Sequence, residues 1–429
     1  LRKGEIMKNI LDKIEQFSGK VSQNTYVSAI RDAFVTIIPF LVLGGVLTFI
    51  DWILLPSKFM TKILSAETIT AIQTMFSQTT TASMGLMTMM TVILLGYNIA
   101  KFKKHENPII VALVALSCFI IGTPIVDSAI PTTWLGSNGM FEGLMFGIIS
   151  SVIFLKVAEN DKLKIKVSGN VPGAIVSTFN NMFAIIITLL IVTFITYGIK
   201  FASGKEIAEL INTTLQAPLV NITATLPGMI VNVLLQNLVF FFGIHPAGVT
   251  NPVFDTPLTI ALTQNAEAIA QGLTPTNICN LAFRDVYTTL GGSGATLGLL
   301  ICMLFFSKRN EVKEIAKVAA PVSIFNINEP VLFGLPVVYN FVMLIPFVAV
   351  SVINVIIAYL ATAAHLVSVL SVYVTWSTPI GFSAFLASAG DFRNVILQLL
   401  LVVLDALIWF PFLKMYEKQL ERQAESDEA

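Results

Sequence analysis

Long apolar runs alternate with short polar segments along most of the 429-residue chain. A helix that crosses a bilayer needs ~20 mostly apolar residues. The run 365–390 is also apolar, but Pro379, Gly381 and Gly390 interrupt it. We therefore predict an all-α polytopic membrane protein with about ten transmembrane helices plus re-entrant hairpins. The clearest candidate spans are 33–55, 75–100, 108–128, 140–157, 174–198, 222–242, 294–306, 336–361 and 394–416.

The composition fits a bilayer better than water as the solvent. Hydrophobic residues make up 55% of the chain, charged residues 12%, and the mean hydropathy is +0.80. Soluble globular domains carry roughly 25% charged residues. The formal net charge is zero, which leaves no basic excess for binding nucleic acid. The chain has three histidines and three cysteines without a CxxC pair, so we expect neither a metal site nor a bound cofactor.

Lysine and arginine are concentrated in alternate loops. They gather in the N-terminal tail, in the loops at 101–104, 156–166 and 308–317, and near the C-terminus. The loops between these are poor in both residues. Because cytoplasmic loops carry the excess of basic residues, we predict a multi-pass protein with both termini in the cytoplasm. The polar N-terminal stretch does not have the pattern of a secretory signal.

The two halves of the chain differ in how continuous their apolar runs are. Apolar runs of the first half are long and uninterrupted, whereas polar clusters at 245–255, 274–285, 326–330 and 375–391 break those of the second half. Irregular backbone at membrane depth survives only where protein buries it or it lines a watery cavity, and broken helices direct backbone groups at a substrate. We predict a cytoplasmic N-terminal segment at 1–30, a scaffold and oligomer-interface membrane domain at 31–203, a possible amphipathic connector at 204–220, a substrate-binding membrane domain at 221–416 and a cytoplasmic tail at 417–429.

A carboxylate stands inside the apolar run 318–344. Glu329 follows Asn326 and Asn328 and precedes Pro330. An ionised acid at the bilayer centre costs ~2.5–3.5 kcal/mol on insertion scales, so it must face a cavity, pair or be protonated. Prolines interrupt the helix here, which predicts the tip of a re-entrant hairpin. Glu329 would accept a hydrogen bond from a ligand hydroxyl and later its proton, with the two asparagines as ligands; the alternative is a loop carboxylate that caps a helix.

A histidine follows the candidate span 222–242. His245 precedes Pro246, and a histidine there could donate to a ligand hydroxyl or shuttle its proton. The alternative is a satisfied histidine at a helix end, but Glu329 in the same half favours the functional interpretation. Asn237 lies about two turns before His245 if the helix continues, so it would line the same cavity.

Arg284 and Asp285 precede a glycine-rich run, Gly-Gly-Ser-Gly at 291–294. An arginine in a largely apolar region would hold a phosphoryl group or another ligand oxygen, or it would form a structural ion pair with Asp285. Both interpretations remain open. The glycine run lacks the lysine of a phosphate-binding P-loop, so it is expected to allow a turn or a close approach of helices.

Two tryptophans lie beside polar side chains. Trp376 has hydroxyl residues on both sides, so it could stack on the apolar face of a sugar or serve as an anchor at the membrane interface. Trp134 lies near Asn138 on the loop after the third span. From there Asn138 would reach a ligand from the first half of the chain.

Several of these segments resemble one family. The runs 326–336, 243–246, 291–296, 17–21 and 29–34 resemble the lactose/cellobiose-type IIC subunits of the phosphoenolpyruvate-dependent sugar phosphotransferase system. The resemblance covers nearly the whole chain. Within that family, the chain looks most like the transporters specific for N,N′-diacetylchitobiose.

The resemblance implies a bacterial inner-membrane permease that functions as a homodimer. The first half would form the dimer contact, and the second half, with two re-entrant hairpins, would bind a disaccharide and carry it inward by an elevator-like, rigid-body movement. A phosphocysteine of a separate IIB protein, itself supplied through IIA, would then phosphorylate a C6 hydroxyl. Glu329 would be the base and His245 its neighbour, with Asn328 and Arg284 as supporting ligands. The chain alone is expected to catalyse nothing.

Two other function classes remain as alternatives. An ion-coupled secondary transporter shares broken helices and a midplane site, and Glu329, Asp255 or Asp285 could supply its ion site. A receptor or channel component is the second alternative, but we find no clean internal repeat in the sequence.

Overall fold

The computed structural model describes residues 24–56, 60–165 and 173–427. Within these ranges nearly all regular structure is helical, and the only β-pairing is an isolated bridge between Val126 and Ala129. The all-α prediction is therefore confirmed. Most of the predicted N-terminal segment, including the run 17–21, lies outside the described residues, as do the last two residues of the tail.

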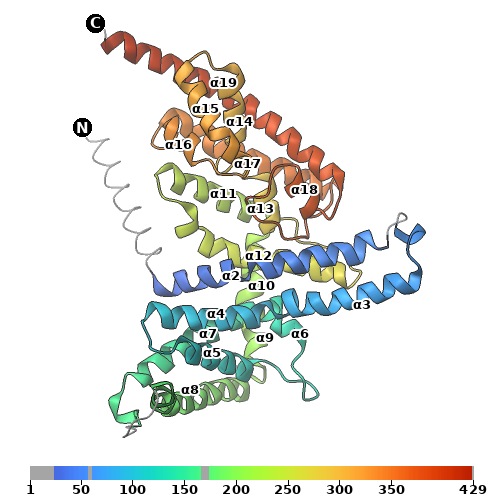
Figure 1. The fold of residues 1–429 in the computed structure, drawn as a ribbon, viewed down its shortest axis with the longest axis vertical. Coiled ribbons are helices and arrows are strands. Elements are labelled where there is room, and N and C mark those ends of the chain that lie inside the picture. Colours follow the sequence, from blue (N-terminus) through green and yellow to red (C-terminus); the bar gives the residue numbers. More distant parts are fainter. Residues whose placement is uncertain (1–23, 57–59, 166–172, 428–429) are drawn as a thin grey trace. The chain divides into compact units, whose positions relative to one another are not determined.

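The chain divides into two compact units. The amino-terminal unit comprises Lys20–Leu47 and Ile72–Leu219, and the carboxy-terminal unit comprises Thr48–Ala71 and Val220–Ala429 besides residues before position 20. Figure 1 labels the helices along the chain. The α-helices up to the start of the second half are α2 (Thr25–Phe49), α3 (Ala66–Ser83), α4 (Met87–Phe102), α5 (Pro108–Gly122), α6 (Thr132–Leu135), α7 (Met140–Ala158), α8 (Gly173–Ser203), α9 (Ile207–Ile211) and α10 (Ala217–Thr223).

The remaining helices belong to the carboxy-terminal unit, and several of them are short. Three helices of six or seven residues alternate there with long apolar ones, as expected for a chain that breaks and restarts at membrane depth. These helices are α11 (Leu226–Phe241), α12 (Asn251–Ala270), α13 (Leu281–Tyr287), α14 (Leu297–Phe306), α15 (Asn310–Ser323), α16 (Glu329–Gly334), α17 (Phe341–Ala363), α18 (Phe382–Ala387) and α19 (Phe392–Asp427).

Six helices among the described residues are long and apolar enough to cross a membrane, or seven if one bent pair counts as a span. That pair joins Ile207–Thr223 to Leu226–Phe241 at an angle of 75°. Two predicted spans correspond to shorter apolar helices, Pro108–Gly122 and Leu297–Phe306. The six spans are Thr25–Thr48, Ala66–Phe102, Ser137–Ala158, Phe179–Ser203, Phe341–Ala363 and Phe392–Glu421.

Small residues allow close helix packing in the amino-terminal unit. A Cβ atom at Gly96 of α4 would lie 2.9 Å from the Cα atom of Ala112 in α5. A Cβ atom at Gly143 of α7 would lie 2.6 Å from the Thr88 side chain. Without a hydrophobic driving force in lipid, helices associate through such close contacts. The unit therefore packs α4, α5, α7 and α8 around a buried apolar cluster that includes Phe119.

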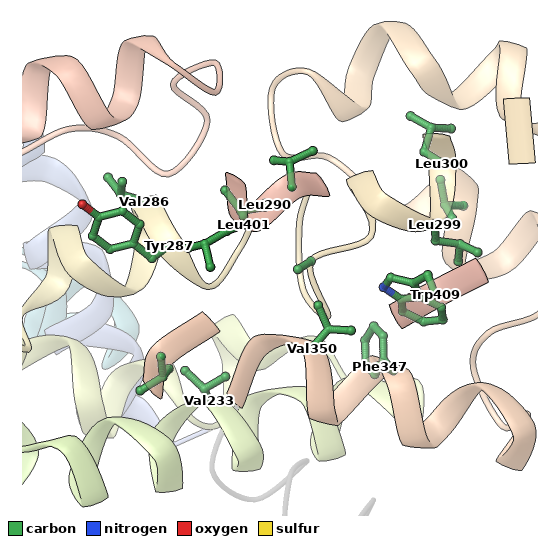
Figure 2. Packing of buried hydrophobic residues seen from close by; sticks show 14 of the residues in the cluster. Val233, Val286, Tyr287, Leu290, Leu299, Leu300, Phe347, Val350, Leu401 and Trp409 are labelled. Carbon is green, nitrogen blue, oxygen red and sulfur yellow. The ribbon is translucent and has the colours of Figure 1, made fainter. Parts of the chain in front are cut away.

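The carboxy-terminal unit has its own apolar core, formed mainly by α11, α14, α17 and α19. Figure 2 shows Trp409 of α19 close to Phe347 of α17 in this core. Both side chains are fully buried. Gly298 brings α14 against α19, because a Cβ atom there would lie 2.5 Å from the backbone nitrogen of Ala406. Two of the short helices pack on this core, α13 against α17 and α18 against α19.

Helix α12 was not among the predicted spans. Its sequence contains threonine, asparagine, glutamine and glutamate, and Pro257 lies within it. These residues lower the hydropathy of the segment, so the pattern does not indicate a span. Ten residues of the helix are nevertheless buried by the surrounding protein. Tertiary packing therefore supports a polar helix that the sequence pattern did not indicate.

Candidate functional site

Glu329 is the first residue of α16. It follows a tight turn after α15, in which Asn326 adopts a left-handed backbone conformation with φ +61°. Pro330 occupies the first turn of α16, where its missing N–H is not needed. The Glu329 side chain is 43% exposed. The helix break predicted from the prolines therefore places a carboxylate where a ligand can reach it.

His245 lies just beyond the C-terminal end of α11. Its Nδ1 accepts a hydrogen bond from the backbone N–H of Ala247 at 3.2 Å. In the neutral imidazole, the proton must then be on Nε2. The His245 side chain is 60% exposed, and its ring centroid lies 5.1 Å from that of Phe240. The backbone hydrogen bond therefore fixes both the tautomer and the direction of the ring.

The two predicted catalytic residues lie side by side. His245 Nε2 is 3.7 Å from Glu329 Oε1. They come from segments more than 80 positions apart in the sequence, η7 (Pro246–Gly248), which His245 caps, and α16. The arrangement combines an N–H donor with a carboxylate acceptor, and both side chains are accessible. Such a pair can bind one hydroxyl group as acceptor and donor at once.

The amide of Asn326 is engaged with the protein. Its Oδ1 accepts from the backbone N–H of Gly291 at 2.9 Å, and its Nδ2 donates to the carbonyl oxygens of Trp376 at 2.6 Å and Thr378 at 3.3 Å. One side chain thus joins three segments of the carboxy-terminal unit. These bonds give Asn326 a positioning role beside Glu329.

Asn328 and Asn237 also contact the glycine loop, residues 291–294. Asn328 Nδ2 donates to the Ser293 carbonyl at 2.7 Å and to the Thr296 hydroxyl at 2.9 Å. Asn237 Oδ1 accepts from the Gly294 N–H at 3.1 Å. Three asparagines predicted as ligands therefore hold the same loop from two segments, α11 and the turn before α16.

The glycine loop adopts a backbone that only glycine accommodates easily. Gly291, Gly292 and Gly294 have φ values of +74°, +102° and +74°. A Cβ atom at Gly292 would lie 2.4 Å from Cγ of Asn328, and one at Gly294 would lie 2.1 Å from the Phe347 ring. The run therefore serves for a turn and a close approach, as its sequence indicated.

Arg284 forms a buried cluster with two carboxylates. Its Nε lies 2.9 Å from Asp285 Oδ1, and its Nη1 pairs with Asp255 Oδ1. The side chains of Arg284 and Asp285 are 6% and 7% exposed, whereas that of Asp255 is 31% exposed. The structural ion pair anticipated as one alternative is thus present. Asp255 is the member of this cluster that a ligand can reach.

The backbone of Trp376 is hydrogen-bonded to the protein, whereas the residue is largely exposed. The Asn326 amide binds its carbonyl oxygen, and its side chain is 53% exposed. The hydroxyl groups of Thr375 and Thr378 lie 3.0 Å apart. An exposed ring beside hydroxyl groups suits a sugar face, and its backbone is tied to the segment that carries Glu329.

Comparison with known proteins decides the family. The family model described as "Phosphotransferase system, EIIC" matches residues 31–351. The chain belongs to the phosphotransferase system EIIC family. The resemblance seen in the sequence is thereby confirmed. As a family member with several apolar helices, this EIIC protein is a multi-pass membrane protein.

Individual relatives of this EIIC chain cover almost its full length. An oligo-beta-mannoside-specific EIIC component of Bacillus subtilis is 29% identical and aligns with 95% of this chain and 94% of its own. A cellobiose-specific EIIC component of Geobacillus stearothermophilus is 27% identical over 97% and 95%. The crystal structure of ChbC, the IIC component of an N,N′-diacetylchitobiose-specific system, matches with a TM-score of 0.88 and 31% identity, covering 96% of this chain and 98% of that one.

The structure of this EIIC protein adds Tyr339 to the site. Its hydroxyl donates to the carbonyl of Phe242 at 2.7 Å, and its backbone N–H donates to the carbonyl of Phe241 at 3.1 Å. Tyr339 therefore holds the end of α11, just before His245. Sequence reasoning overlooked Tyr339. Tyr339 has an unusual backbone conformation with positive φ, and this conformation cannot be recognised in the sequence.

Asn138 lies in the other unit of this EIIC chain. Its carbonyl oxygen accepts a hydrogen bond from Asn212 Nδ2 at 2.9 Å. Together with Trp134 and Glu209, it lines a cavity of about 260 Å³ within the amino-terminal unit. Its role as a sugar ligand stays a prediction. Within the described residues, no group of three or more metal-ligating side chains is found.

Proposed function

We propose that this EIIC protein binds a disaccharide of the diacetylchitobiose or cellobiose type at the His245–Glu329 pair. It then carries the sugar inward by an elevator-like movement and presents the C6 hydroxyl to the phosphocysteine of a separate IIB protein, which IIA supplies. The observation that carries this proposal is the 3.7 Å separation of His245 Nε2 and Glu329 Oε1. Family membership and the sugar specificities of similar EIIC components support it.

The chemistry assigns one task to each member of the pair. The C6 hydroxyl donates its hydrogen bond to Glu329 and accepts one from Nε2–H of His245. As the C6 oxygen bonds to phosphorus, the phosphorus–sulfur bond breaks, and the electron pair leaves on the IIB cysteine as thiolate. The hydroxyl proton passes to Glu329 as a general base. Transfer of this kind depends mainly on positioning, which the asparagines and Tyr339 supply.

The remaining parts of the proposal concern the assembly. Trp376 stacks on the sugar, and Asn328, Asn326, Arg284 and Asn237 bind it or hold the groups that do. The protein works as a homodimer in the bacterial inner membrane, with the amino-terminal helices as the dimer contact. Both termini lie in the cytoplasm, in keeping with the lysine-rich loops.

The test of the base uses Glu329→Gln. The amide still bonds a hydroxyl but cannot take its proton, so sugar binding should persist while phosphorylation by IIB falls by about 10²–10⁴. A matched control is Glu314→Gln, which removes an exposed acid paired with Lys317 at 2.6 Å and should leave both activities unchanged. If Glu329→Gln lost sugar binding and phosphorylation equally, Glu329 would not be the general base.

The test of the coupling uses vesicles with radiolabelled diacetylchitobiose or cellobiose. Labelled sugar 6-phosphate should accumulate only when phosphorylated IIB is enclosed. Accumulation of free sugar driven by an imposed sodium or proton gradient would instead make the chain an ion-coupled secondary transporter. Glu329 would then be a coupling carboxylate.

A further inference from the structure

Asp405 of α19 and Asn354 of α17 form a buried pair inside the carboxy-terminal unit. Both residues are 0% exposed, and both lie within candidate membrane spans. Asn354 Nδ2 donates to Asp405 Oδ2 at 3.2 Å. Neither residue belongs to the His245–Glu329 site. The charge of a carboxylate at this depth would be expensive, so its protonation state needs an explanation.

Two oxygen atoms of this pair have no hydrogen-bond donor. Asp405 Oδ1 and Asn354 Oδ1 are both buried, and no described residue donates a hydrogen bond to either. With an ionised Asp405, both orphan atoms are acceptors, and each would lose the hydrogen bonds that water gave it. With a protonated Asp405, Oδ1–H can donate to Asn354 Oδ1, and one proton satisfies both atoms. The result is an eight-membered acid–amide ring with two parallel hydrogen bonds.

No nearby positive charge offers another way to satisfy the carboxylate. Asp405 packs against Gly298 of α14, where a Cβ atom would lie 2.7 Å from Asp405 Cβ. Cys302 on the same helix donates its Sγ–H to the Ala406 carbonyl at 3.1 Å. No lysine, arginine or histidine among the described residues forms an ion pair with Asp405. The local groups are thus an amide, a thiol and the apolar surfaces of two helices.

The pair lies on the same two helices as the residues that contact the glycine loop. Asn354 is two helical turns after Phe347 in α17, and Asp405 is one turn before Trp409 in α19. Phe347 packs on Gly294, and Trp409 Nε1 donates to the Gly294 carbonyl at 3.3 Å. The Asn354–Asp405 hydrogen bond therefore joins the two helices that hold this loop between them.

We propose that Asp405 holds a proton in a neutral acid–amide ring with Asn354, and that this pair is a positioning element for the glycine loop and hence for the Glu329 segment. The link to Glu329 runs through Asn328, which bonds the Ser293 carbonyl of the same loop. Asp405 does not touch the sugar and carries no charge during transport. This inference deepens the proposed function, and its uptake measurements rest on that function.

The discriminating variants are Asp405→Asn and Asp405→Leu. The introduced amide can form the same ring with Asn354, because one amide donates and the other accepts at each edge. Asp405→Asn should therefore keep sugar affinity and uptake within about twofold of the wild type. Asp405→Leu and Asn354→Leu leave a buried polar group without a partner and should lower uptake about tenfold or more. The exchange variant, Asn354→Asp with Asp405→Asn, should behave like the wild type.

Infrared spectroscopy of the purified protein reads the proton directly and does not depend on transport. A protonated-carboxyl band should persist between about pH 6 and 9 and should shift in deuterated buffer. The difference spectrum of wild type minus Asp405→Asn should contain it, which separates it from the buried carboxyl of Glu142. Absence of the band in the wild type overturns the proposal, because the orphan oxygens then have another partner such as water.

Uptake measurements separate the proton from a bound cation. If Asp405→Asn loses as much uptake as Asp405→Leu, or if it removes a sodium dependence seen in the wild type, an ionised Asp405 binding a cation replaces the neutral ring. If the band is present but uptake proves independent of IIB, the proposed function fails while the acid–amide ring stands. If uptake depends on IIB but the band is absent, the acid–amide ring fails while the proposed function stands.

Discussion

Asn326→Ala is the substitution whose effect follows most directly from the structure. Asn326 makes three side-chain hydrogen bonds, to Gly291, Trp376 and Thr378, at 2.9, 2.6 and 3.3 Å. It is 6% exposed, so water does not replace them. The substitution would remove one of the side chains that hold the glycine loop and, at the same time, the side-chain bonds to the Trp376 segment.

The magnitude has two parts. Three hydrogen bonds at roughly 1 kcal/mol each contribute about 3 kcal/mol. The backbone of Asn326 has φ +61°, a left-handed conformation that costs alanine more than asparagine, and this adds about 1 kcal/mol. The expected loss of stability is therefore about 4 kcal/mol. Asn326→Gly loses the same hydrogen bonds without the backbone strain, so it should be about 1 kcal/mol less damaging than Asn326→Ala.

The assay is reversible unfolding of the purified protein in detergent, combined with sugar-binding affinity. A positioning role predicts a large loss of stability together with weakened binding. If Asn326→Ala is as stable as the wild type but binds sugar poorly, Asn326 is a direct ligand and the reasoning from its hydrogen bonds is wrong. Equal stabilities of the alanine and glycine variants would refute the backbone part alone.

Three further predictions concern other parts of the carboxy-terminal unit. Trp376→Ala should weaken disaccharide binding about three- to tenfold through lost stacking, measured by equilibrium binding, and unchanged affinity would make Trp376 an interface anchor. Arg284→Lys should lower stability by about 2–4 kcal/mol, because one ammonium cannot replace the fork that joins Asp255 and Asp285; recovery of wild-type unfolding behaviour would contradict this. Gly298→Ala should lower the free energy of unfolding by about 1–3 kcal/mol, because the added Cβ atom would clash with α19. An unchanged unfolding midpoint would show that α14 and α19 can move apart without loss of stability.

The sequence alone was enough to predict the membrane as the solvent and the helical class. The apolar runs are long enough to predict most of the spans, since a bilayer imposes a length on each helix. The carboxylate of Glu329 and the imidazole of His245 stand out because polar groups are expensive in apolar surroundings. The Asn-Glu-Pro motif also pointed to the family that the comparisons confirm.

Other features were determined only by the tertiary structure. The sequence does not tell whether an asparagine amide contacts a ligand or the protein backbone. Only the fold shows that Asn237, Asn326 and Asn328 form hydrogen bonds with neighbouring segments. Helix α12 escaped prediction because neighbouring elements, not its own pattern, bury it.

The pairing of groups distant in the chain is the clearest case. Asn354 and Asp405 are 51 positions apart, and neither has a local signal that names its partner. The same holds for His245 and Glu329, which become a donor–acceptor pair only when α11 and α16 are brought together. Sequence patterns report which residues avoid lipid or water, because transfer energies act on each residue alone. Which polar groups meet is decided by packing, because hydrogen bonds depend on distance and direction in the folded chain.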